Sequence, residues 1–270
     1  MVCCPEWSRG TRESSVETPG PAVGVIPARL ESTRLPRKLL LAETGRVLLE
    51  YAWRAASRAR TLDEVIVATD SQEIAGAVRG FGGRAELTGE HASGTDRVAE
   101  VVRRCCDEAG IIVNIQGDEP ELEPDHIDGL VDSLRAEAAL QMATLACPIR
   151  DRRTLEDSSC VKVVTTVDGR ALYFSRHPIP FVRDQSPESL FEDTTPWMLH
   201  VGLYAYRREF LLELASLPAS PLEELERLEQ LRALQHGAAI GVSVAEHSAV
   251  GIDTPEDYAR FIARVKSYAA

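Results

Sequence analysis

The alternation of short apolar runs with helical patterns constrains the fold of this chain more than any other feature of its sequence. Short runs rich in Val, Ile and Ala are separated by longer stretches in which apolar residues recur every three or four positions. The first pattern is typical of buried strands and the second of amphipathic helices. Strands that alternate with helices favour βαβ units. The sequence therefore predicts an α/β fold with a mostly parallel sheet.

The expected elements cover most of the chain beyond residue 21. The expected strands are AVGVIPA (22–28), EVIVATD (64–70), RAELT (84–88), IIVNIQGD (111–118), MATLACPI (142–149), VKVVTTV (161–167), ALYFS (171–175), MLHVGLYAY (198–206) and IGVSVAE (240–246). The expected helices lie near 47–59, 71–79, 95–108, 124–137, 207–215, 221–235 and 254–265. In the helix near 221–235, the side chains expected to face the core are Leu222, Leu225 and Leu228.

One stretch interrupts the βαβ rhythm. The dipeptide Asp168-Gly169 stands between two β-rich runs, which predicts a hairpin with a type I′ turn. Together with the long strand that follows, this hairpin predicts a small antiparallel lobe from about residue 147 to 208. Such a lobe commonly supplies a second substrate site or a dimer contact. We expect one domain over residues 22–270, into which this lobe is inserted.

Composition excludes several classes of protein. Residues 1–21 show no hydrophobic period and are expected to form a disordered extension, because they bury too little to offset the entropy of ordering. The net charge of −12 opposes binding to a nucleic-acid backbone. No apolar run approaches the roughly 20 residues that cross a bilayer, and the first residues lack a signal-peptide pattern. We therefore expect a cytoplasmic protein without nucleic-acid or membrane partners.

A basic loop follows the first expected strand. Residues 29–38 hold four cations, which are Arg29, Arg34, Arg37 and Lys38. In an open α/β sheet, the loops at the carboxyl ends of the strands bind the ligand. Cationic side chains there bind phosphates through charge-assisted hydrogen bonds. The loop is a candidate triphosphate site, and a solvated basic loop is the alternative.

Three further segments place polar groups at the ends of expected elements. HASGTDR (91–97) begins a helix, where unpaired backbone N–H groups bind a base edge or a phosphate, or where the segment is merely a cap. Asp118 ends a strand, and Mg²⁺ prefers one or two carboxylates together with phosphate oxygens and water. An acidic turn is the alternative for Asp118. Asp253 stands before Thr254-Pro255, a good start for a helix, and could simply reinforce that cap.

Taken together, these segments resemble the signature motifs of the Kdo (3-deoxy-manno-octulosonate) cytidylyltransferase family. The matching segments are PARLESTRLPRK (27–38), HASGTDR (91–97), QGDEP (116–120), YFSR (173–176), LHVGLYAYR (199–207), LEQLR (228–232) and GIDTPED (251–257). The similarity spans nearly the whole chain from Val23. The chain differs from the family at Arg37, where the family has Gly, and at Leu39, where it has Pro. Glycine permits backbone conformations that Arg adopts poorly.

The resemblance implies a role for each matched residue. Catalysis and Mg²⁺ binding would fall to Asp118 and Asp253, with Lys38 and Arg29 as the other catalytic groups. The implied CTP-binding residues are Arg29, Arg34, Lys38, Ser93, Gly94 and Gln116. The implied Kdo-binding residues are Arg176, His200, Tyr204, Glu229 and Gln230.

The resemblance also implies an architecture and a reaction. The fold would be a Rossmann-like nucleotidyltransferase sheet with a small antiparallel lobe for sugar binding and dimerisation. The reaction would convert CTP and Kdo into CMP-Kdo and pyrophosphate, which activates Kdo for lipopolysaccharide biosynthesis. We expect Mg²⁺ dependence and a homodimer.

Two alternatives stay open at the level of sequence. A related cytidylyltransferase for a sialic-type acid or for amino-Kdo would share the nucleotide half of the site and differ in the sugar pocket. A nicotinamide-dependent oxidoreductase is suggested by residues 80–85, GFGGRA, which fit GxGxxA. That match stands after an expected helix and before an expected strand, which is the reverse of the order that the motif requires.

Overall fold

The computed structural model describes residues 20–184, 186–191 and 195–269. The extension expected over residues 1–21 therefore lies outside the described residues except for its last two. The dipeptide Gly20-Pro21 already joins the fold, since the carbonyl of Pro21 accepts a hydrogen bond from Gly110 N at 2.9 Å. None of the described helices is long and apolar enough to span a membrane.

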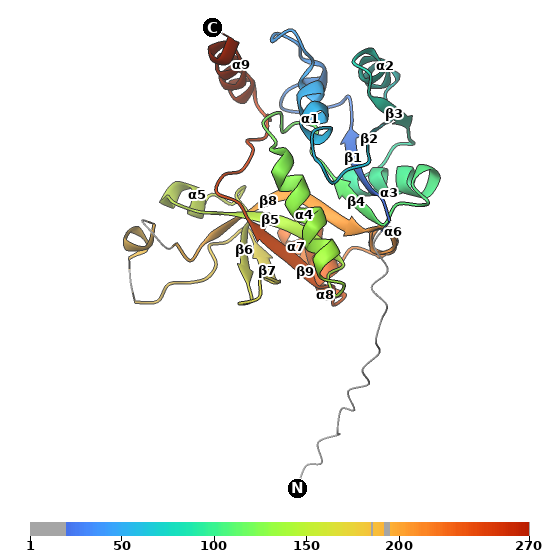
Figure 1. Ribbon diagram of the computed structural model, residues 1–270. Helices are drawn as coiled ribbons and strands as arrows, with labels where there is room; N and C mark the ends of the chain where they lie inside the picture. The colour runs from blue at the N-terminus through green and yellow to red at the C-terminus, as the bar shows by residue number, and fades with distance from the viewer. Residues whose placement is uncertain (1–19, 185, 192–194, 270) are drawn as a thin grey trace, which may run out of the picture.

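A nine-stranded mixed sheet forms the centre of the molecule (Figure 1). Its strands are β1 (Ala22–Ala28), β2 (Glu64–Thr69), β3 (Arg84–Leu87), β4 (Ile111–Asn114), β5 (Met142–Pro148), β6 (Lys162–Thr165), β7 (Ala171–Ser175), β8 (Met198–Arg207) and β9 (Ile240–Val244). Seven of them follow the order β3-β2-β1-β4-β8-β5-β9. On this path β8 runs antiparallel to its neighbours β4 and β5, and the other pairings are parallel. The predicted α/β fold with a mostly parallel sheet is confirmed.

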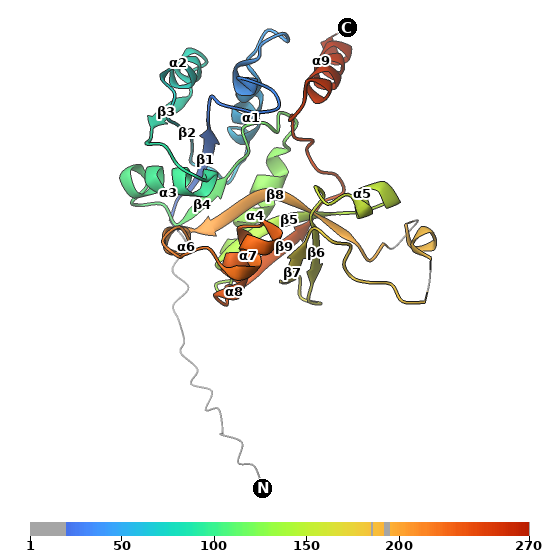
Figure 2. The same cartoon turned by 180° about the vertical axis from the view of Figure 1, so that it is seen from behind.

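Helices cover both faces of the sheet. They are α1 (Leu48–Ala56), α2 (Gln72–Gly80), α3 (Gly94–Cys105), α4 (Pro124–Ala136), α5 (Arg152–Glu156), α6 (Arg208–Leu214), α7 (Pro221–Glu226), α8 (Gln230–Gln235) and α9 (Pro255–Ala269), with 3₁₀ helices η1 (Lys38–Leu40) and η2 (Pro187–Leu190). Residues of α1, α2 and α4 pack in one core, and residues of α3, α6 and α8 pack in the other. The view from behind shows α3, α6, α7 and α8 in front of the sheet (Figure 2).

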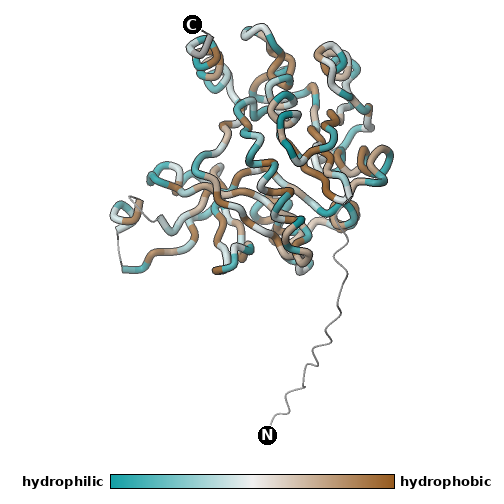
Figure 3. Tube along the Cα trace, viewed as in Figure 1, coloured by the Kyte–Doolittle hydropathy of each residue, from teal (hydrophilic) through white to brown (hydrophobic). Residues whose placement is uncertain are grey.

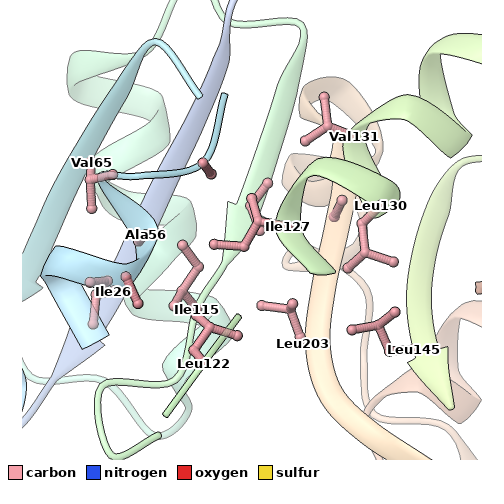
Figure 4. Packing of buried hydrophobic residues seen from close by; sticks show 14 of the residues in the cluster. Ile26, Ala56, Val65, Ile115, Leu122, Ile127, Leu130, Val131, Leu145 and Leu203 are labelled. Atoms are coloured by element: carbon pink, nitrogen blue, oxygen red, sulfur yellow. The ribbon is translucent and has the colours of Figure 1, made fainter. Parts of the chain in front are cut away.

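Burial on both faces explains the apolar strands. Every residue of β4 is buried, as are six of the seven in β1, because helices cover both faces. Hydrophobic residues accordingly concentrate along the inner strands (Figure 3). In the first core, Ile26 and Ile115 on the strand side belong to the same buried cluster as Ile127 and Leu130 of α4 (Figure 4). This packing holds the carboxyl ends of β1 and β4, where the candidate site residues lie.

The antiparallel excursion joins the sheet through β8. Strand β6 pairs antiparallel with β7 and with β8, and β8 in turn pairs with β4 and β5. The predicted lobe of residues 147–208 therefore shares a strand with the main sheet. That residues 147–208 form a distinct lobe within the domain stays a prediction.

The hairpin turn differs from the predicted type. Gly169 has a positive φ of 80°, whereas Asp168 is not among the positive-φ residues, so the turn is not type I′. Instead Gly169 N donates to Thr166 O at 3.1 Å and Thr166 N donates to Arg170 O at 2.8 Å. A three-residue loop, here residues 167–169, that ends in a left-handed residue is the next common hairpin solution.

The helix predicted over 221–235 is broken into α7 and α8. Arg227 ends α7 in a left-handed conformation, with φ 55° and ψ 49°. This turn exposes Leu225, whose relative accessibility is 81%, while Leu228 is buried. The prediction that Leu225 faces the core is wrong because one helical register does not continue through residues 227–229. Residues 80–85 link the end of α2 to β3, so they lack the strand-loop-helix context of a dinucleotide-binding motif.

Candidate active site

The basic loop after β1 brings Lys38 to the carboxyl end of the sheet. Arg37 adopts a left-handed conformation, with φ 56° and ψ 28°, and η1 begins at the next residue. This region of φ favours glycine, so the backbone keeps a shape for which glycine is better suited. The side chain of Arg37 pairs with Glu73 of α2 and points toward that helix. It is not one of the residues that line the cavity described below.

Lys38 joins the two aspartates that are far apart in the sequence. Its Nζ lies 2.5 Å from Asp118 Oδ2 and 2.9 Å from Asp253 Oδ1, and it also donates to the carbonyl of Ile252 at 3.1 Å. Arg34 pairs with the other oxygen of Asp253 at 2.9 Å. Burial opposes the charge of Lys38, but the two carboxylates outweigh burial and raise its pKa. The two carboxylates thus converge on one cation.

Local structure explains how Asp118 and Asp253 reach each other. Asp118 follows the buried strand β4, and its carbonyl accepts a hydrogen bond from Ile252 N at 2.9 Å. Asp253 precedes α9, where Asp257 Oδ2 accepts from the backbone N–H groups of Asp253 at 3.2 Å and Thr254 at 2.9 Å. Thr254 Oγ1 accepts from Asp257 N at 3.2 Å, which completes the predicted cap. Because Asp257 serves that cap, the carboxylate of Asp253 is free to meet Lys38.

The donor set suits Mg²⁺ better than a metal held by protein alone. The described residues contain no group of three or more His, Cys, Asp or Glu side chains that could hold a metal ion. Two carboxylates facing a common point, with room for phosphate oxygens and water, are the donors that Mg²⁺ prefers. The ammonium of Lys38 already shows that a positive charge is stable between them. Asp118 and Asp253 therefore fit Mg²⁺ in the presence of a phosphate ligand.

A cavity of about 370 Å³ lies over this cluster. Of the predicted CTP-binding residues, it is lined by Arg29, Arg34, Lys38, Ser93, Gly94 and Gln116, and both aspartates line it as well. The cap of α3 uses the side chain of Ser93, whose Oγ accepts from Asp96 N at 3.1 Å. The amide of Gln116 donates to Gly202 O at 3.3 Å. The structure thus gathers the predicted nucleotide residues from three loops into one cavity.

A second cavity, of about 490 Å³, lies between β8 and the segment that joins α7 to α8. It is lined by four of the predicted Kdo residues, which are His200, Tyr204, Glu229 and Gln230. Gln230 is 5% exposed, and its Nε2 has no hydrogen-bond partner among the described residues. A buried donor without a partner is costly, so Gln230 is suited to a ligand with hydroxyl or carboxylate acceptors.

His200 is a neutral group in the wall of the second cavity. Burial lowers its pKa to about 3. Its Nε2 lies 3.1 Å from Thr144 Oγ1, and this hydroxyl also donates to the carbonyl of Leu203 at 2.9 Å or of Val201 at 3.1 Å. Because the hydroxyl has a single proton, Nε2 carries the hydrogen and Nδ1 is left as an acceptor. His200 is therefore suited to accept a hydrogen bond from a sugar hydroxyl.

Arg176 is the predicted Kdo-binding residue that does not line this cavity. Its guanidinium donates to the carbonyls of Glu226 at 2.6 Å, Ser158 at 2.9 Å and Arg227 at 3.3 Å. In this structure Arg176 ties together two segments that border the cavity. Its predicted role as the ligand of the Kdo carboxylate stays a prediction.

The two cavities meet at a common wall. They have no lining residue in common, yet three short segments contribute to both of them. In segments 94–95 and 118–119, the first residue lines the first cavity and the second residue lines the second. In segment 251–253, Asp253 lines the first cavity and Gly251 lines the second. Groups bound in the two cavities would therefore approach each other beside Asp118 and Asp253.

Comparison with known proteins identifies the family to which the chain belongs. The family described as cytidylyltransferase matches residues 23–240. The 3-deoxy-manno-octulosonate cytidylyltransferase of Geobacter sulfurreducens is 46% identical over 247 residues, which are 90% of this chain and 98% of that protein. The protein of the same name from Solibacter usitatus is 47% identical over 243 residues, 90% of this chain and 93% of that one. The chain belongs to the 3-deoxy-manno-octulosonate cytidylyltransferase family.

Solved structures agree with membership of this cytidylyltransferase family. A CMP:2-keto-3-deoxy-manno-octonic acid synthetase complexed with CTP superposes with a TM-score of 0.85, at 38% identity, over 92% of this chain and 99% of that one. The 4-diphosphocytidyl-2C-methyl-D-erythritol synthase of Anaerococcus prevotii superposes with a TM-score of 0.60 over 93% and 98% of the two chains. At 14% identity, this second likeness concerns the fold alone. The predicted family and the predicted nucleotidyltransferase class are confirmed.

The sequence prediction missed several residues in the walls of the two cavities, among them Arg97, Glu119 and Thr95. Arg97 lines the first cavity, is 4% exposed, and donates to Asp70 at 2.6 Å and to Thr88 at 2.5 Å. Glu119 and Thr95 line the second cavity. Burial, and then the charge of Asp118, raises the pKa of Glu119 to about 8. All three residues lie within the motifs HASGTDR (91–97) and QGDEP (116–120), and this position in the sequence could have identified them.

Proposed function

We propose that this chain transfers CMP from CTP to Kdo, releasing pyrophosphate, and so activates Kdo for lipopolysaccharide biosynthesis. The observation that supports this function best is the common wall, because a cavity lined by Arg29, Arg34 and Lys38 and a second cavity lined by His200 and Glu229 meet beside Asp118 and Asp253. A transfer between two bound substrates needs their reacting groups to be held in contact.

The residues of the first cavity position CTP. Arg29, Arg34 and Lys38 line it and carry the charge that the triphosphate requires. The anomeric hydroxyl of Kdo gives up its proton to solvent as its oxygen forms the new bond to the α-phosphorus, and the bond from that phosphorus to the leaving pyrophosphate breaks. Lys38 and Arg29 neutralise negative charge on the departing pyrophosphate, which is the electrostatic stabilisation that such transfers need.

The reaction depends on Mg²⁺ in this proposal. Asp118 and Asp253 would hold the ion, which would supply further charge neutralisation at the phosphate oxygens. Lys38 contacts both carboxylates in the free protein. If the two carboxylates held the ion, the ammonium of Lys38 would be available to pair with phosphate oxygens of CTP.

The second cavity accepts the sugar. His200 offers an acceptor, Gln230 an unpaired donor, and the carboxylate of Glu229 a further acceptor. This mixture suits a polyhydroxylated substrate. The identities of 42–47% to proteins named for 3-deoxy-manno-octulosonate favour Kdo over a sialic-type acid.

We also propose a cytoplasmic homodimer. CTP is an intracellular nucleotide, and the net charge of −12 opposes nucleic-acid partners. Among the described residues of the region 147–208, three large apolar side chains are exposed, which are Val167, Leu172 (57% exposed) and Phe181 (85% exposed). Burial of such side chains is a common reason for association. Sedimentation of the native protein and of a Leu172→Glu, Phe181→Glu variant tests this, since the variant should be monomeric.

The decisive experiment measures pyrophosphate released from CTP and each acidic sugar. We expect turnover with Kdo in the presence of Mg²⁺ and none with CTP alone. The variant Asp118→Ala should remain folded and lose activity by about a hundredfold to a thousandfold, in line with the loss of a charge-stabilising group. Amino-Kdo and a sialic acid are the comparison substrates. An inactive native protein with all three acids would refute the proposal.

A further inference from the structure

A hydrogen bond crosses from the nucleotide side of the site to the sugar side. Thr95 is the second residue of α3, and its Oγ1 donates to Glu229 Oε2 at 2.7 Å. The residue is 8% exposed and lines the second cavity, whereas its neighbour Gly94 lines the first. Glu229 stands 134 residues further along the chain, just before α8. The contact thus joins two segments that belong to opposite halves of the site.

The hydroxyl of Thr95 is committed to this contact. A threonine hydroxyl has one proton to donate. Near a helix start, such a side chain usually bonds to the backbone of its own helix. Here the capping role belongs to Ser93, whose Oγ accepts from Asp96 N at 3.1 Å, so Thr95 is available to donate to Glu229.

The contact holds one oxygen of Glu229 and leaves the other available. Among the described residues, the carboxylate of Glu229 has Thr95 as its hydrogen-bond donor, and its Oε1 accepts from none of them. The residue as a whole is exposed. A glutamate in that position without a donor samples several rotamers, and fixing it on a ligand costs binding free energy.

We infer that Thr95 is a positioning residue that holds the Glu229 carboxylate ready for a hydroxyl of the sugar. It acts through Glu229 and touches neither the reacting phosphorus nor the metal. This inference depends on the proposed function, because it assigns the second cavity to the acceptor sugar. It also makes the start of α3 serve both cavities, the first through Gly94 and the second through Thr95.

The test compares the Michaelis constants for the two substrates. Thr95→Val keeps the shape of the side chain and removes the hydroxyl, so the KM for Kdo should rise about tenfold, while the KM for CTP changes less than about twofold. Thr95→Ser restores the hydroxyl and should bring the KM for Kdo back to within about twofold of the native value. In a Glu229→Gln background, Thr95→Val should add little, because the two residues act as one unit.

A matched control separates this role from general destabilisation. Thr61 Oγ1 donates to Asp128 Oδ1 at 2.8 Å, and neither residue lines a cavity. Thr61→Val removes the same kind of bond and should lower the melting temperature without raising the KM for Kdo. If Thr95→Val did not fold, Thr95→Ala would take its place in the comparison.

The outcomes distinguish the inference from the proposed function. Native protein that is inactive with Kdo would refute the function itself. Active native protein combined with an unchanged KM for Kdo in Thr95→Val would refute the role of Thr95 alone. Equal rises in the Michaelis constants for CTP and Kdo, or failure of Thr95→Ser to restore binding, would also overturn it.

Discussion

Replacing Gly117 by alanine tests how closely the packing of the core controls the position of Asp118. Gly117 is buried beside that aspartate and does not have a positive φ, so its backbone suits alanine. A Cβ atom there would lie 3.0 Å from Leu49 Cδ1 and 3.2 Å from Ile26 Cγ2. Both neighbours are fully buried at 0% exposure. Either they or the backbone of residues 117–118 must therefore move.

The expected size of the effect follows from this crowding. Overpacking a core by one methyl group costs about 1–3 kcal/mol, which for a domain of this size lowers the melting temperature by about 2–12 °C. A misplacement of about 1 Å at a catalytic group costs about a hundredfold. A shift of about half that distance in Asp118 should lower kcat/KM by about tenfold.

Gly129 supplies the matched control. It lies within α4, and a Cβ atom there would meet nothing within 4 Å. Gly129→Ala should stabilise the helix by about 0.5–1 kcal/mol and leave the activity unchanged. Thermal unfolding and pyrophosphate release would be measured for both variants. If Gly117→Ala kept full stability and activity, the core would have accommodated the methyl group without moving Asp118, and the predicted link between core packing and the position of Asp118 would be wrong.

Three further predictions concern the loop, the metal and acid stability. In chemical denaturation, Arg37→Gly should be more stable than Arg37→Ala by about 0.5–1 kcal/mol. Both variants lose the exposed ion pair with Glu73, and only glycine adopts the left-handed conformation of residue 37 without steric strain. Equal stabilities of the two variants would contradict this. EDTA should abolish activity and Mg²⁺ restore it, with the melting temperature of the free protein unchanged, because Lys38 already bridges Asp118 and Asp253; persistent activity in EDTA would exclude the metal. Below pH 6.5 the unfolded chain protonates His200 while the folded chain, with a pKa of about 3, does not, so stability should fall as the pH drops toward 3. At pH 5 this loss is at most about 2 kcal/mol and should be smaller in His200→Gln, as denaturant titrations at pH 7 and pH 5 would show.

Local patterns were sufficient to predict most elements. Each expected strand has a counterpart in the sheet, because β1, β4 and β5 are covered on both faces and their apolar runs are unmistakable. The predicted helix over 221–235 was wrong because one residue adopts an unusual backbone conformation. Arg227 has a φ of 55° and breaks the helix expected over 221–235. The hydrophobic pattern does not reveal this break, since the leucines on both sides of Arg227 continue the helical spacing across it.

Apolar periodicity and short motifs are local properties, so they are sufficient to predict the α/β class and the family of this chain. Tertiary packing, by contrast, places Lys38 between Asp118 and Asp253 and brings the two cavities to a common wall beside them. It also directed the guanidinium of Arg176 to backbone carbonyls and the hydroxyl of Thr95 to Glu229. These contacts join residues from 18 to 215 positions apart. The packing of helices and strands determines which residues form these contacts, and short stretches of sequence do not specify that packing.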